Sequence, residues 1–75
     1  FSATEQSRPF AELTNREYEI TQLVGQGASN ADIAAQLGIA ERTVKSHLST
    51  IFAKTSTNGR LALALLYNTV LNHRS

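Results

Sequence analysis

The chain has 75 residues, of which 41% are hydrophobic, no cysteine, and a formal net charge of +1. This length allows one small domain, and the lack of cysteine excludes a disulfide framework and a thiolate metal site. No apolar run approaches the roughly 20 residues of a membrane-spanning helix, so we expect a soluble, cytoplasmic protein without a membrane partner. Because the chain begins with Phe1 and has no methionine, we expect a processed chain or a fragment of a longer protein.

Charge is segregated along the sequence. Up to and including Glu41 there are two bases and six acids, a net charge of −4, whereas the remainder has five bases and no acid, a net charge of +5. The five bases are Arg42, Lys45, Lys54, Arg60 and Arg74. The overall charge of +1 therefore conceals a polarised molecule.

The periodicity predicts an all-α domain at residues 13–75, preceded by a polar linker or disordered segment at residues 1–12. A capping box of Thr14 and Glu17 marks the start of the first helix, and Gly25 and Gly27 supply its stop. The four helices are expected at about residues 14–26, 29–37, 41–54 and 59–72.

The second helix is short and is capped by Ser29, with Asp32 at the third helical position. Gly38 ends it and permits a tight turn into the third helix. The backbone amides of Asn30 and Ala31, with the Ser29 hydroxyl and the Asn30 side chain, could hold a phosphate, but simple capping is an equally good interpretation. The inward side chains are expected to be Ile33, Ala34 and Leu37, after Ile20, Leu23 and Val24 of the first helix.

The third helix has the clearest period, with an apolar stripe of Val44, Leu48, Ile51 and Phe52. Its opposite surface is small, hydroxylic and basic. Arg42 and Lys45 can donate to guanine acceptors or phosphates, and side chains as short as those of Ser46, Ser49 and Thr50 leave the helix free to enter a groove. The alternative is an ordinary solvated helix face. We favour DNA binding, because no acid follows Glu41 and a short helix bounded by glycine precedes this one.

Two other classes of site find little support. His47 borders the apolar stripe, where it either packs or contacts a phosphate, and no second ligand lies at metal-binding spacing. No nucleophile has a nearby base, and no glycine-rich phosphate loop follows a strand. We therefore expect neither an enzyme nor a cofactor.

The last helix, for which Asn58 is a candidate cap, is apolar nearly all round. Leu61 and Leu65 define one side, and a small domain can cover only one of two apolar sides. We expect a dimer interface here, the alternatives being a fully packed core helix or a face covered by a missing domain. The interface is assigned to the second side, which consists of Leu63, Leu66, Tyr67 and Val70.

Three segments carry a family resemblance: LTNRE at 13–17, GQGASNADIAAQLGIAERTVKSHLSTIFAKT at 25–55, and the ALALL that follows. They resemble the C-terminal effector domain of LuxR-type bacterial transcription regulators. The most specific part is IA-x-x-LGI-x-x-RTVK-x-H at 33–47. The resemblance implies a helix-turn-helix motif at 30–49, a third helix that reads DNA, and a fourth that mediates dimerisation on roughly palindromic sites.

By the same resemblance, Thr43 and Lys45 fall on DNA-contact positions, and Ser46 and Ser49 on base-facing positions that vary with the operator. Asn30, His47 and Lys54 match positions of backbone contact or support. The chain departs from the family at Ala40, which lacks the usual capping hydroxyl, and at residues 55–57, where many members have Leu-Gly-Val. The expected DNA-binding set is Asn30, Arg42, Thr43, Lys45, Ser46, His47, Ser49, Thr50 and Lys54.

We therefore expect a bacterial regulator domain that binds double-stranded DNA as a homodimer and lies at the nucleoid. Its sensory or receiver domain is expected to be missing from this chain, and RNA polymerase is a further candidate partner. One alternative is a promoter-reading module of the sigma-factor type. The other is a protein-interaction domain that kept the fold without DNA binding.

Overall fold

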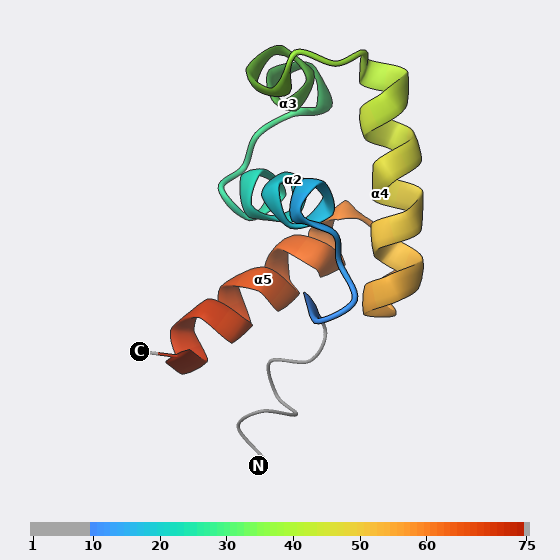
Figure 1. Cartoon of the computed structure of the whole chain (residues 1–75). Helices are drawn as coiled ribbons and strands as arrows, with labels where there is room; N and C mark the ends of the chain where they lie inside the picture. The colour runs from blue at the N-terminus through green and yellow to red at the C-terminus, as the bar shows by residue number, and fades with distance from the viewer. Residues whose placement is uncertain (1–9, 75) are drawn as a thin grey trace.

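The computed structural model describes residues 10–74, whose regular elements are four α-helices, so the predicted all-α four-helix fold is confirmed. All predicted bounds agree to within two residues. None of the helices in this part of the chain is long and apolar enough to cross a membrane. The helices are α2 at Asn15–Gly25, α3 at Asn30–Leu37, α4 at Glu41–Thr55 and α5 at Arg60–Arg74 (Figure 1).

Helix α2 packs against both α4 and α5, while α3 packs against α4 near the start of α4. Figure 1 shows α4 standing along one side of the molecule and α5 running from beside α4 toward the other side.

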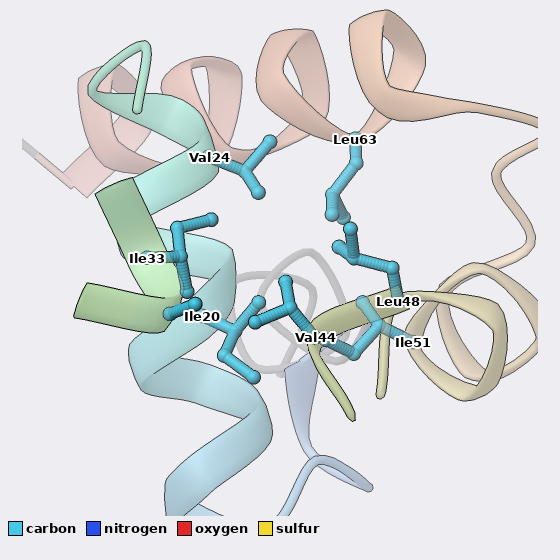
Figure 2. Close-up of a cluster of buried hydrophobic side chains, with 8 residues drawn as sticks. Ile20, Val24, Ile33, Val44, Leu48, Ile51 and Leu63 are labelled. Atoms are coloured by element: carbon cyan, nitrogen blue, oxygen red, sulfur yellow. The ribbon is translucent and has the colours of Figure 1, made fainter. Parts of the chain in front are cut away.

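One apolar cluster joins all four helices (Figure 2). The side chains predicted to point inward from α2, α3 and α4 are buried or half-buried in it, and Leu63 enters it from α5. Burying each of the large side chains contributes about 1.5–3 kcal/mol relative to exposure, so this cluster fixes the relative positions of the helices. Its members are Ile20, Val24, Ile33, Ala34, Val44, Leu48, Ile51 and Leu63.

Three of the four helices end in the same way, with one residue in the left-handed conformation and an amide beyond it that bonds back into the last turn. The left-handed residues are Gly27 (φ 92°), Gly38 (φ 69°) and Ser56 (φ 57°). The backward bonds run from Ala28 N to Leu23 O, from Ile39 N to Ala34 O and from Thr57 N to Phe52 O, each 3.0 Å. The prediction that Gly27 and Gly38 end helices is thus confirmed, and Ser56 plays the same part without being a glycine.

Gly25 has a different role from the predicted stop signal. It is the last residue of α2 and has no positive φ, but a Cβ atom built on it would lie 2.3 Å from Cδ2 of Tyr67. The glycine is therefore required by the close approach of α2 and α5.

The helix starts follow the predicted caps at two of four positions. The reciprocal bonds of a capping box are present for Thr14 with Glu17 and for Ser29 with Asp32. Ala40 makes no side-chain cap bond, as predicted. At α5 the first helical bond runs from Leu63 N to Gly59 O (3.1 Å), so Gly59 occupies the cap position and Asn58 does not.

The predicted linker covers residues 1–12, of which 1–9 lie outside the described residues. Phe10 belongs to the domain in its packing, because its ring centroid lies 5.9 Å from that of Tyr18 and 6.1 Å from that of Tyr67. These separations are typical of interacting aromatic pairs. The packed part of the chain therefore begins before the first capping box.

Candidate nucleic-acid interface

Helix α4 presents the polar face that its sequence predicts. Val44, Leu48 and Ile51 of its apolar stripe are buried in the cluster of Figure 2, and the opposite side of the helix faces solvent. Phe52 of the stripe is half-buried against this cluster. Seven residues of the helix are exposed, and all but Ala53 are charged or hydroxylic. These seven, which we call the α4 outer face, are Glu41, Arg42, Lys45, Ser46, Ser49, Thr50 and Ala53.

The two basic side chains of the α4 outer face are available to a partner. Neither Arg42 nor Lys45 forms a salt bridge with an acid of residues 10–74. Thr50 Oγ1 donates to the carbonyl oxygen of Ser46 at 3.4 Å, and this bond keeps its hydroxyl close to the helix. The face thus combines short side chains with two cations that are unpaired among residues 10–74, and so lets an anionic surface approach the backbone closely.

Thr43 and His47 lie on the flank of α4 rather than on its outer face. Both are half-buried, and neither side chain makes a hydrogen bond to the described part of the chain. His47 is therefore partly packed against the domain, and its contact with a phosphate stays a prediction.

Lys54 is engaged within the domain. Its Nζ donates to Glu17 Oε1 at 2.8 Å and to the Glu12 carbonyl oxygen at 3.2 Å, and its side chain is 29% exposed. The hydrogen bond from Lys54, followed by that from the Thr14 backbone amide, lowers the pKa of the Glu17 carboxyl. Lys54 therefore attaches the end of α4 to the start of α2, the supporting role that was one of its two expected roles.

The start of α3 is capped rather than open. Ser29 Oγ accepts from the Asp32 amide at 3.1 Å, and the Asp32 carboxylate accepts from the Ser29 amide at 3.4 Å. Capping is thus confirmed for Ser29. Asn30 is half-buried, and its Oδ1 accepts a hydrogen bond of 2.6 Å from Nη1 of Arg60.

Arg60 was not predicted as a functional residue. It is the first residue of α5, where the helix dipole disfavours a base. That unfavourable placement could have identified Arg60 from the sequence, because a cation at a helix start is stabilised only by hydrogen-bond acceptors from another part of the fold. The acceptors are Asn30 and the carbonyl oxygen of Ala28.

The predicted dimer residues require a correction. Leu63 is 0% exposed and Tyr67 is 8% exposed, so neither has surface to offer to a second chain. Leu66 and Val70 are half-buried. The domain covers this side of α5 with α2, and it leaves the other side open, with Leu61 73% and Leu65 60% exposed.

The site has the geometry of a binding surface. Within residues 10–74, no group of three or more His, Cys, Asp or Glu residues could hold a metal ion. Within the described part of the chain, the fold assembles one exposed helix face with two unpaired basic side chains, next to a capped helix start to which Arg60 is hydrogen-bonded.

Comparison with known proteins supplies the context for this surface. Residues 11–67 match the family described as bacterial regulatory proteins, luxR family. The chain is 39% identical over 59 residues to the nitrate/nitrite response regulator protein NarP of Escherichia coli, covering 79% of this chain and 27% of that protein.

Two further relatives are also named as transcriptional regulators. The chain is 43% identical over 60 residues to the transcriptional regulatory protein DegU of Brevibacillus brevis, covering 80% of this chain and 25% of that protein. It is 53% identical over 51 residues to a monoamine regulon transcriptional regulator of Klebsiella aerogenes, covering 68% of this chain and 22% of that protein. The chain thus spans only about a quarter of the length of these relatives.

Proposed function

This chain belongs to the luxR family of bacterial regulatory proteins, and from that premise we propose that it binds double-stranded DNA as a dimer, with α4 in the major groove. The chain is a DNA-binding regulatory module and not an enzyme. The proposal concerns how it binds: the outer face of α4 reads the operator, and α5 pairs two copies on a roughly palindromic site.

The observation that carries the proposal is the α4 outer face. Arg42 and Lys45 are exposed and unpaired among the described residues, and the side chains between and beyond them are short. A major groove admits an α-helix, and basic side chains at these positions can donate hydrogen bonds to guanine acceptors or to phosphates. Ser46 and Ser49 are the side chains that we assign to base edges. Thr50 lies on the same face, and Thr43 and His47 lie on its flank.

Dimerisation is proposed through the side of α5 that the fold leaves exposed. Leu61 and Leu65 are one helical turn apart and lie mostly in solvent, and a small domain seldom leaves such a stripe uncovered. A two-fold dimer through this stripe would set two copies of α4 on successive half-sites of one duplex.

We further propose that residues 13–75 are the DNA-binding domain of a longer regulator and that residues 1–12 link it to an N-terminal sensory or receiver domain. Two observations support this. The chain spans only a quarter of its relatives, and NarP is named a response regulator. Contact with RNA polymerase and a place at the nucleoid would follow from this function.

Lys45→Ala tests the groove assignment, and Arg16→Ala is its matched control. Arg16 is also an exposed base, but it lies on α2 and pairs with Glu19. We expect Lys45→Ala to weaken binding to a site selected from random duplex DNA by at least about 1 kcal/mol, roughly fivefold, and Arg16→Ala to change it little. Equal affinity of wild type and Lys45→Ala at moderate salt would refute the role of Lys45.

The same selection tests the dimer, because two half-sites at a fixed spacing are expected among the selected sequences. A wild-type chain that binds no duplex DNA even at low salt would instead favour a protein-interaction domain.

A further inference from the structure

Arg60 connects α5 with the start of α3. The two helices otherwise pack against different partners, α5 against α2 and α3 against α4. From the first turn of α5, its Nη1 donates to Asn30 Oδ1 at 2.6 Å, and its Nη2 donates to the carbonyl oxygen of Ala28. Both acceptors belong to the segment where α2 passes into α3, about thirty residues earlier in the chain. One planar guanidinium therefore holds a side chain and the backbone of that segment together.

The pairing dictates which way the Asn30 amide faces. A guanidinium has only donors, so the atom of Asn30 that faces Arg60 must be the oxygen. The amino group, Nδ2, is then directed away from Arg60, and it has no hydrogen-bond partner among residues 10–74. A freely rotating amide would present its oxygen outward for part of the time, and that oxygen cannot donate to anything.

We propose that Arg60 is a positioning residue for DNA binding, which orients the Asn30 amide so that its amino group donates to a backbone phosphate. The inference rests on the proposed function, because it presumes that α3 and α4 lie on a duplex. Phosphate oxygens accept hydrogen bonds only, so an outward amino group binds them and an outward carbonyl oxygen is repelled. Arg60 acts through Asn30 and does not itself touch the DNA.

The main variant is Arg60→Met, which removes both hydrogen bonds and keeps an unbranched side chain. Binding of the whole chain to a fluorescein-labelled duplex of mixed sequence is measured by anisotropy over a range of salt concentrations. We expect Arg60→Met to weaken binding about fivefold in the wild-type background and less than about twofold when combined with Asn30→Ala, because both substitutions remove the same contact. Arg16→Met is the control for the loss of one positive charge.

The salt dependence separates positioning from direct contact. A basic side chain that neutralises a phosphate contributes about 0.9 to the slope of log affinity against log salt concentration. We expect the slope of Arg60→Met to equal that of Arg16→Met. A slope lower by about 0.9, or an equal loss of affinity with and without Asn30→Ala, would overturn the positioning role while leaving DNA binding intact. A wild type that binds no duplex would end both proposals together.

A second variant keeps the inference testable if Arg60→Met fails to fold. Asn30→Asp retains an oxygen acceptor for Arg60 and places an acid in the first turn of α3, where the helix dipole favours it. Circular dichroism should therefore show a folded chain. We expect its affinity for the duplex to fall at least as far as that of Asn30→Ala, since the outward donor is replaced by an anion. Unchanged affinity would show that no outward amino group is needed at this position.

Discussion

The outward faces of α4 and α5 belong to adjacent helices of equal length, but they differ in chemistry. The α4 outer face is charged and hydroxylic, whereas the outward side of α5 carries Leu61 and Leu65 in solvent. On α4 the buried and exposed sides contrast strongly. On α5 both sides are rich in leucine.

This difference explains why the sequence predicted the buried side correctly for α4 and not for α5. The rotational phase of a helix can be predicted when polar and apolar residues separate onto two sides, as they do on α4. On α5 both sides are apolar, and the side that contains Leu63 and Tyr67 was predicted as the interface, but the domain buries that side in its own core. Which of two apolar sides is covered depends on the shape of α2, and in particular on the room that Gly25 leaves for Tyr67.

The largest expected effect comes from placing a charge on each side of α5. Leu63→Glu buries an unpaired carboxylate and should destabilise the domain by about 4 kcal/mol or more, as a loss of cooperative unfolding would show. Leu65→Glu should change stability by no more than about 0.5 kcal/mol while lowering self-association in sedimentation equilibrium. A folded Leu63→Glu would reverse the assignment of the two sides, whereas a wild type that stays monomeric at high concentration would contradict dimerisation through α5.

Gly25→Ala tests the fit between α2 and the covered side of α5. Alanine normally stabilises a helix interior relative to glycine, but the new Cβ would meet the Tyr67 ring at 2.3 Å. We expect a net loss of about 1–3 kcal/mol in the free energy of unfolding, measured with urea. In a Tyr67→Leu background, the same Gly25→Ala substitution should cost less. If Gly25→Ala alone stabilises the domain, close packing is not the reason for the glycine.

The contacts that sequence alone could not supply are those between residues far apart in the chain. The elements, the two capping boxes and the α4 outer face follow from local patterns. The Lys54 to Glu17 pair, the Arg60 connection and the packing of Phe10 each join residues from different segments. No local period encodes them, and the family resemblance gave Lys54 only as a contact or a support.

Lys54→Met tests whether that side chain supports the end of α4. Its removal leaves the nearly buried carboxylate of Glu17 without its cation, and we expect a loss of about 1–2 kcal/mol at neutral pH, moderated because Lys54 is partly exposed. The pKa of Glu17 is lowered in the folded state, so the stabilisation is complete above its ordinary value of 4.5 and is lost as the pH falls through the lowered pKa. The difference in urea midpoint between wild type and variant should therefore narrow below pH 4.5. A difference that does not depend on pH would contradict the ion pair.

The smallest effect is expected where α4 ends and the chain turns into α5. Ser56 holds φ at 57°, a conformation that disfavours residues with a Cβ, while Gly27 and Gly38 serve the other two ends. Ser56→Gly should therefore raise the free energy of unfolding by about 0.5–1 kcal/mol after the greater chain entropy of unfolded glycine is deducted. Gly38→Ser is the reverse control, because a Cβ there would meet no atom within 4 Å and its cost reports the backbone alone. The midpoint temperature of thermal unfolding should rise for Ser56→Gly and fall by a similar amount for Gly38→Ser. A destabilised Ser56→Gly would mean that the serine side chain contributes to the connection between the two compared helices.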